Sequence, residues 1–229
     1  MRRSSPMARK FVSFVGLTTL VLLPIASNAS GILYQFDTPF PSDPSPSGST
    51  PWITANFDDA SGGVLLTIAA VGLTGSEFAS QIYFNLAPSL DPASLTFNAT
   101  ASSGTFSVPT IDHASQNSYK ADGDGKYDFR FNFGTANGTT FGAGDSITYL
   151  ISGISGLTAS NFSFLSAPAG GSGPFYGAAH IQALADGSST WIEPGIGPII
   201  TPVPEPAPIA LLAVSTILWG IFRLRMRKD

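Results

Sequence analysis

The strictest pattern in this sequence is an alternation of aromatic and polar side chains near the middle of the chain. Between Lys126 and Phe133 every second residue is aromatic, namely Tyr127, Phe129, Phe131 and Phe133. A period of two places these rings on one face of a strand and their polar neighbours on the other. One buried and one solvated face are typical of antiparallel sheets, so the segment predicts a strand of that kind.

The same pattern recurs, shorter and weaker, along residues 30–200, which we take as the folded body. The runs 52–58 and 64–71 flank a Ser-Gly-Gly turn signal and predict a hairpin. Glycine (24) and proline (18) are abundant, which favours many turns, and no long segment has a helical period. Further strands are predicted at 80–86, 94–99, 104–108, 146–152, 161–165 and 177–184, with one short helical turn at 75–79 and an extended loop at 39–51.

These elements predict an all-β fold class, an antiparallel β-sandwich or jelly roll of about eight to ten short strands. A β-barrel stays open as an alternative, and so, with less support, does a β-solenoid, since no repeat of fixed period stands in the sequence. The chain has no cysteine, so the body folds without disulfides and offers no thiol for catalysis or metal binding.

The first 29 residues have the three regions of a secretory signal peptide. Residues 2–10 are basic, residues 11–25 are apolar, and Ser27-Asn28-Ala29 offers small side chains at the −3 and −1 positions. We therefore expect export through the Sec translocon and cleavage after Ala29. The alternative is an uncleaved anchor helix, but the apolar stretch is short for a membrane span.

The last 29 residues, 201–229, also have three parts in a fixed order. The motif Val203-Pro204-Glu205-Pro206 comes first, followed by an uncharged apolar stretch at 209–222, for which we expect a transmembrane helix. A basic tail ends the chain and would stay in the cytoplasm, leaving the body outside. Its cationic residues are Arg223, Arg225, Arg227 and Lys228.

This order resembles the PEP-CTERM sorting domain, and the resemblance covers residues 202–229. It implies an exported protein of a Gram-negative bacterium that makes extracellular polysaccharide. It also implies exosortase as the partner that processes the tail, an inner-membrane-anchored precursor, and a mature form at the cell surface or in the extracellular matrix. The same tail is sometimes labelled after ice-binding proteins that carry it. A plain single-pass anchor after a proline-rich stalk is the alternative.

The charges of the chain are concentrated at its ends. Of the 11 Lys and Arg residues, four lie in the first ten positions and four in the last seven. Residues 30–206 hold three Lys or Arg against 14 Asp or Glu, a net charge of −11. An acidic body argues against nucleic acid as a partner, because phosphates are bound by basic patches.

One acidic segment is a candidate metal site. Asp122, Asp124 and Asp128 stand on a glycine-rich turn and could offer hard oxygen ligands to Ca²⁺. The spacing departs from the EF-hand loop, since Gly125 stands at position 5 and Phe133 at position 12. A hairpin turn with positive-φ residues is the other interpretation, and the two are compatible. We expect no cofactor other than this calcium.

Residues suited to catalysis are few. His113 and His180 are the only histidines, and no GxSxG elbow accompanies them. A glycosidase would need two facing carboxylates, but nothing in the sequence pairs the candidates. These are Asp58, Asp59, Glu77 and Glu193. We therefore expect that the protein is not an enzyme.

Three functions from different classes remain at this point. The first is a structural protein of the cell surface or matrix, linked to exopolysaccharide and biofilm. The second is a carbohydrate-binding or ice-binding module, in which Trp52, Tyr176 and Trp191 would serve if exposed. The third is a polysaccharide-acting enzyme, which would need a converging pair of acids in a cleft.

Overall fold

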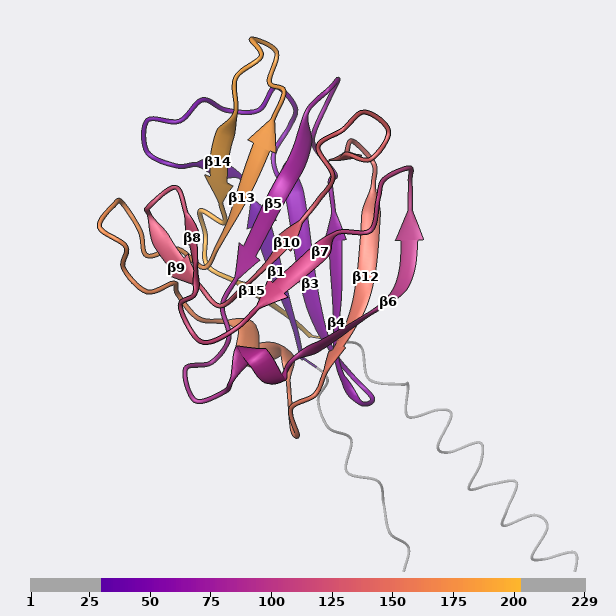
Figure 1. The fold of residues 1–229 in the computed structure, drawn as a ribbon, viewed down its shortest axis with the longest axis vertical. Helices are drawn as coiled ribbons and strands as arrows, with labels where there is room; N and C mark the ends of the chain where they lie inside the picture. The colour runs from indigo at the N-terminus through magenta and orange to yellow at the C-terminus, as the bar shows by residue number, and fades with distance from the viewer. Residues whose placement is uncertain (1–29, 203–229) are drawn as a thin grey trace, which may run out of the picture.

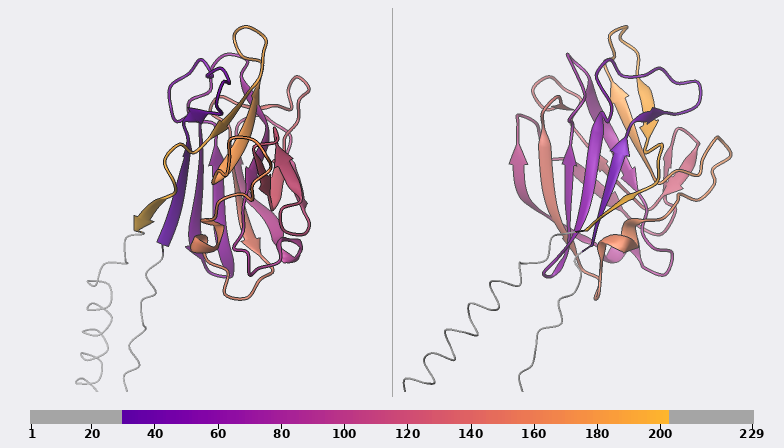
Figure 2. Two further views of the ribbon diagram at one scale, coloured as in Figure 1. Left: turned by 90° about the vertical axis from the view of Figure 1, so that its left-hand side faces the viewer. Right: turned by 180° about the vertical axis from the view of Figure 1, so that it is seen from behind.

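The computed structural model describes residues 30–202, and these residues form an all-β fold with almost no helix. Two antiparallel sheets face each other as two layers (Figures 1 and 2). The first sheet has the order β15 (Ile199–Pro202), β1 (Ser30–Phe36), β3 (Ile53–Ala60), β4 (Gly63–Ala69), β12 (Ser146–Ser152) and β6 (Thr96–Ser103). The second has the order β2 (Thr38–Pro39), β14 (Thr190–Glu193), β13 (Gly177–Gln182), β5 (Phe78–Phe84), β10 (Phe129–Asn132) and β7 (Thr110–His113), with β11 (Phe141–Gly142) also paired to β5.

Smaller elements complete the described part of the chain. The strands β8 (Tyr119–Ala121) and β9 (Gly125–Tyr127) form a separate hairpin, and η1 (Pro92–Ser94) and η2 (Ala159–Phe162) are short 3₁₀ turns. Both large sheets are open, with a strand at each end that lacks a second neighbour in its sheet. Within residues 30–202 the fold is therefore a pair of layers and not a closed barrel. No helix in this range is long and apolar enough to cross a bilayer.

The main core lies between the two sheets and is rich in aromatic rings. Alternate residues of β4 and β12 are buried, as the period of two requires. Phe84 of β5 lies at the centre, with its ring centroid 5.2–6.2 Å from those of five other rings. These belong to Tyr34, Phe36, Phe57, Phe129 and Phe131. Edge-to-face and tilted contacts of this kind add to the free energy gained by burying the rings.

A second, smaller core lies on the outer side of the β2–β7 sheet. It contains Phe40, Tyr83, Ala121, Tyr127 and Ala178. The β8–β9 hairpin supplies two of these residues and so packs against this part of the sheet (Figure 1). The sheet is therefore covered on both sides over part of its area.

Most of the predicted strands are confirmed. The 52–58 and 64–71 runs form the β3–β4 hairpin, in which Ala55 pairs with Ile68 and Phe57 with Leu66. Its turn needs glycine, because a Cβ on Gly63 would lie 2.0 Å from the carbonyl oxygen of Ile151. The 80–86, 94–99, 146–152 and 177–184 segments correspond to β5, β6, β12 and β13, and the 39–51 loop is irregular after β2.

The central prediction is only half right, because the 126–133 run is not one strand. The chain breaks at Asp128, between β9 and β10. Tyr127 packs in the smaller outer core, whereas Phe129 and Phe131 face the main core. The aromatic period is real, but it serves two cores, and the break lets the chain pass from one to the other.

Other predictions were wrong or incomplete. Residues 104–108 are irregular, the 161–165 segment begins with the end of η2 and contains no strand, and 75–79 makes a simple turn before β5. Six strands of two to four residues were not predicted, since each is too short to show a period: β2, β7, β8, β11, β14 and β15. The seven-residue β1 was also missed, although Ile32, Tyr34 and Phe36 alternate along it.

Replacing Phe84 by alanine should lower the free energy of unfolding by about 3–5 kcal/mol, because the lost ring leaves a cavity among its aromatic neighbours. Urea unfolding followed by fluorescence measures this. The matched control is Phe164→Ala, since Phe164 is 37% exposed, and its cost should stay below about 1 kcal/mol. Equal losses in the two variants would contradict a central role for Phe84.

Candidate functional site

The two ends of the described chain meet at one end of the fold. In the β1–β15 pair, Ser30 lies opposite Pro202 and Leu33 opposite Ile199. The expected cleavage residue Ala29, the motif 203–206, the helix 209–222 and the tail 223–229 lie outside the described residues. The residues to which these segments are attached, Ser30 and Pro202, nevertheless lie side by side. We call this end the base, and the opposite end, which carries the loops 40–52, 70–77, 133–140 and 183–189, the distal end (Figures 1 and 2).

Residues 122–124 form the turn of the β8–β9 hairpin, as expected, and the rest of the acidic segment continues through β9 to Asp128. Asp122 and Gly123 have positive φ values of 46° and 82°, and Lys120 pairs with Lys126 across the hairpin. The carboxylate of Asp124 accepts a hydrogen bond from the backbone N–H of Ser172. This contact ties the hairpin to the loop around residue 172.

Asp128 points away from that turn and into the protein. Its two carboxylate oxygens accept the backbone N–H groups of Leu86 at 2.8 Å and Asn117 at 2.7 Å. The residue is 2% exposed, and burial raises the pKa of Asp128 in spite of these two donors. Asp128 therefore joins three segments of backbone, whereas Asp124 binds the loop around residue 172. The calcium site stays a prediction.

The candidate catalytic acids do not form a pair. Among residues 30–202 no group of three or more His, Asp or Glu side chains is placed to hold a metal ion. Asp59 accepts the backbone N–H of Ala159 at 2.6 Å, and Asp58 accepts a hydrogen bond from Asn56. Glu77 is 3% exposed and binds the backbone N–H groups at 47 and 74. Asp59 and Glu77 therefore hold other segments of backbone, whereas Asp58 bonds to a side chain of its own strand.

The carboxyl group of Glu193 lies in surroundings that strongly favour its neutral form. It lies on β14, half-buried on the outer side of its sheet and opposite Thr38. Burial, and then the negative charge of Asp37, raise the pKa of Glu193 to about 7. Asp37 itself accepts hydrogen bonds from Thr38 and from the backbone N–H of Gly195. This pair of acids is located where β2 joins β14.

Both histidines have structural contacts. His180 lies 3.0 Å from the Ser80 hydroxyl through Nδ1, and its ring stacks on that of Trp191 at 4.6 Å. Burial lowers the pKa of His180. The Nδ1 of His113 lies 3.1 Å from the carbonyl oxygen of Pro92. These contacts order the two rings within the β2–β7 sheet and its neighbouring turn.

The three aromatic residues named as sugar platforms are occupied by other side chains. Trp52 is 4% exposed, and its Nε1–H donates to the carbonyl of Gly48. Trp191 lies between Phe40 and His180, with stacked interplanar angles of 26° and 16°. The ring of Tyr176 packs on Tyr34, at 6.3 Å between centroids. Trp52 is therefore buried, whereas Trp191 and Tyr176 remain partly exposed beside their ring partners.

A closed ring of polar side chains crosses the outer face of the β2–β7 sheet. Arg130 Nε donates to Asp112 at 2.8 Å, Asn132 donates to Asp112 at 3.0 Å, and Gln81 donates to Asn132 at 3.1 Å. Tyr83 then donates to Gln81 at 2.8 Å and accepts from Arg130 at 3.4 Å. The register explains the ring, because Arg130 lies between Asp112 and Tyr83 across three strands. Its members satisfy one another, so it orders this face.

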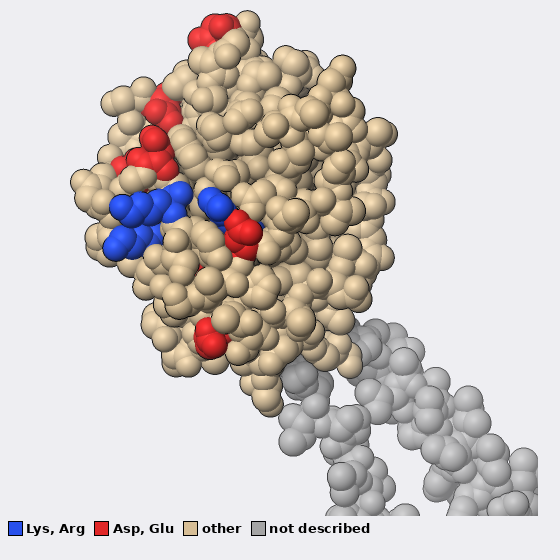
Figure 3. Space-filling model, in the orientation of Figure 1, with Lys and Arg blue, Asp and Glu red and all other residues tan. Residues whose placement is uncertain are grey.

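Sequence reasoning missed this ring, although part of its signal was present. Arg130 and Asn132 are polar members of the aromatic alternation, so they were expected on the wet face. Their partners come from β5 and β7, which pair with β10 on either side. The three Lys and Arg residues of the described range, Lys120, Lys126 and Arg130, gather beside β8 and β9 (Figure 3).

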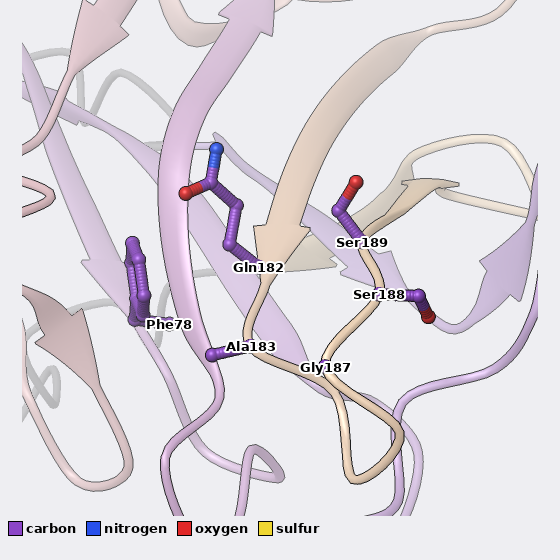
Figure 4. Close-up of a pocket in the computed structure, with 6 residues that line it drawn as sticks. All are labelled: Phe78, Gln182, Ala183, Gly187, Ser188 and Ser189. Atoms are coloured by element: carbon purple, nitrogen blue, oxygen red, sulfur yellow. The ribbon is translucent and has the colours of Figure 1, made fainter.

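Two shallow hollows lie at the distal end. The first, of about 430 Å³, is lined by Phe78, Gln182 and the 183–189 loop (Figure 4). The second, of about 500 Å³, shares Phe78 and Ala183 with it and extends to Asp145. The Asp145 carboxylate accepts the backbone N–H groups at 105 and 142, so it holds the backbone around this hollow. The hollows offer a polar surface and no evident reactive group.

Comparison with protein-family models, with curated proteins and with solved structures found no match for this chain.

Substituting asparagine for Asp128 should lower the free energy of unfolding by about 1–3 kcal/mol, because one backbone donor then faces an amide N–H₂ group. Asp122→Asn is the matched control; it is exposed, and asparagine tolerates positive φ, so we expect little change. Urea unfolding at pH 7 compares them. A neutral Asp128→Asn variant would show that the carboxylate does not hold Leu86 and Asn117.

The stability of the protein should fall between about pH 5 and pH 8 through Glu193. The folded state binds this proton more tightly than the unfolded chain does, since the pKa rises from 4.5 to about 7. The stabilisation that this proton gives the folded state is therefore complete below pH 4.5 and is lost as the pH rises through 7. Allowing for the half-exposure of the group, Glu193→Gln should gain about 1–2 kcal/mol relative to wild type over this range.

The measurement is the midpoint of urea unfolding at pH 5 and pH 8 for wild type and Glu193→Gln. Asp186→Asn is the control, because Asp186 is exposed and hydrogen bonds from Ser188 lower its pKa, so it titrates below this range. If wild type and Glu193→Gln have parallel pH profiles, the raised pKa of Glu193 is wrong.

Proposed function

We propose that this protein is an exported structural protein of the cell surface or extracellular matrix. Its β-rich body is displayed outside the cell, and residues 201–229 act as a PEP-CTERM sorting signal that exosortase processes. One observation carries the proposal: the β1–β15 pair brings Ser30 and Pro202 together at the base. The expected signal cleavage site and the expected sorting tail are thus attached at the same point.

This geometry suits a body held by its tail. If the helix 209–222 lies in the inner membrane of the precursor, the base faces the membrane and the distal loops point away. The cleavage site after Ala29 would then lie near the membrane surface, where signal cleavage takes place. If the tail left from the distal end instead, the cleavage site and the membrane helix would lie at opposite ends of the body. The chain would then have to run back along the body to bring both to the membrane.

The surroundings of the candidate residues favour a structural role over an enzymatic one. Asp59, Glu77, Asp128 and Asp145 all accept backbone N–H groups and so hold loops in place. The aromatic residues named for a carbohydrate-binding module pack against the protein's own side chains. Exopolysaccharide remains the class of matrix partner that the tail implies, and the observations assign no sugar site on the body.

The sorting proposal is tested in an exosortase-positive host and in its exosortase deletion. An epitope inserted in the exposed turn at Asp186 follows the body at the distal end, far from the base. We expect the full-length precursor to accumulate in the inner membrane only in the deletion strain. Glu205→Ala should give the same accumulation in the positive host, and Pro208→Ala, outside the motif, should not. Equal retention of the tail in both strains would overturn the sorting proposal.

A further inference from the structure

A sheet edge is a row of backbone N–H and C=O groups that can pair with another strand, and proteins usually protect such edges. Within residues 30–202 the two large sheets end in four strands, β15, β6, β2 and β7, and the two-residue β11 lies beside β5. Proline and charge protect three of them. The β2 edge is two residues long and includes Pro39, and β15 ends at Pro202 after Pro198. The β7 edge is four residues long and carries Asp112.

The β6 edge has no such protection along eight residues. Its sequence contains no charge and no proline, and seven of its eight residues are exposed, Phe97 being the exception. The uncharged stretch runs from Pro92 to Ile111, and the neighbouring strands β12 and β4 are uncharged as well. In Figure 3 the surface on the side of β6 bears no charged side chain. One bulge opposite Thr148 and Tyr149 interrupts the pairing with β12 but does not cover the outer edge.

We propose that the β6 edge pairs with the β6 edge of a second copy of this chain, antiparallel and about a twofold axis. The choice of occupant follows from length and charge. Among the free edges of the described residues, β6 alone offers eight uncharged residues, so only another β6 matches it over its whole length. Two neutral edges also meet without like-charge repulsion, and a twofold pairing closes as a dimer.

The pairing joins the two six-stranded sheets into one continuous sheet. Neighbouring strands of the first sheet are all antiparallel, so β6 runs in the same direction as β1, from the base towards the distal end. In an antiparallel β6 pair the two bases therefore point in opposite directions. The inference rests on the body alone and does not require the sorting tail.

The absence of native cysteine allows a clean test by cysteine cross-linking. Single cysteines are placed at Thr96, Asn98, Ala101 and Ser103, which lie opposite outward-facing residues of β12. Paired antiparallel strands bring opposite Cα atoms to about 4.5–5.5 Å, within the range of a disulfide. Ala185→Cys, on the exposed distal loop, is the control. Cells that express the full chain are extracted with a mild detergent, which frees any copies held in a membrane; the extract is then oxidised and analysed on non-reducing gels.

For a cysteine at an interior β6 position, we expect the gel band to move from the mass of one chain to that of two. The share of cross-linked chains should decrease towards the ends of the strand, and Ala185→Cys should give no cross-linked band. Adding Ala101→Lys to the cross-linking variant should abolish the shift, because it places two like charges at the shared edge. Ala185→Lys should leave it unchanged. The melting temperature of each lysine variant shows whether the body is still folded.

Two results would overturn the proposal. One is cross-linking of the β6 positions no stronger than that of Ala185→Cys. The other is cross-linking of Asn98→Cys chains only to Ile200→Cys chains, which would place β15 of the next copy on this edge and give an open chain. The test is read after detergent extraction in exosortase-positive and deletion strains, because extracted copies can turn over whether or not the tail is retained. Failed sorting then shows as a retained tail, and the dimer band still reports on β6.

Discussion

The rest of the structure depends on one aromatic core held between two sheets. The chain has no cysteine, so burial of apolar surface must offset the conformational entropy lost on folding without the help of cross-links. Phe84 contributes most directly, since it contacts rings from β1, β3 and β10. Even the polar end of a core tyrosine is satisfied, because the hydroxyl of Tyr34 donates to the carbonyl of Phe162 at 2.7 Å.

Two buried carboxylates and one half-buried carboxylate complement that core by fixing the segments around it. Asp128 links Leu86 and Asn117, Glu77 links the backbone at 47 and 74, and Asp145 links that at 105 and 142. Each spans strands or loops that no regular ladder connects. In a body with only three Lys or Arg residues, backbone N–H groups take the place of cations as partners for these acids. The low charge of the chain is thus compatible with a well-connected fold.

The sequence predicted the all-β class and most of the longer strands, because a period of two is visible over seven or eight residues. It could not predict the break at Asp128, because the local alternation continues through that residue. The break depends on contacts with a segment distant in sequence: the Asp128 N–H donates to the carbonyl of Phe84, and its carboxylate accepts the N–H of Leu86. Short strands such as β2, β14 and β15 show no period in the sequence; hydrogen bonding to neighbouring strands places them in the sheets. The polar ring of Arg130 was half visible, since the alternation placed Arg130 and Asn132 on the wet face, but Asp112, Gln81 and Tyr83 are brought there by register.

The base and the β6 edge together constrain how copies of this protein can meet. The β1–β15 pair fixes where the described chain begins and ends, and the direction of β6 fixes which way the base points in a paired copy. Two copies held in one membrane have parallel β6 strands and cannot form the antiparallel twofold pair. Copies released into a matrix can form it, and so can copies that face each other from two cells. Tail processing by exosortase would then also control assembly, because release from the membrane would allow the body to turn over and form the antiparallel β6 pair.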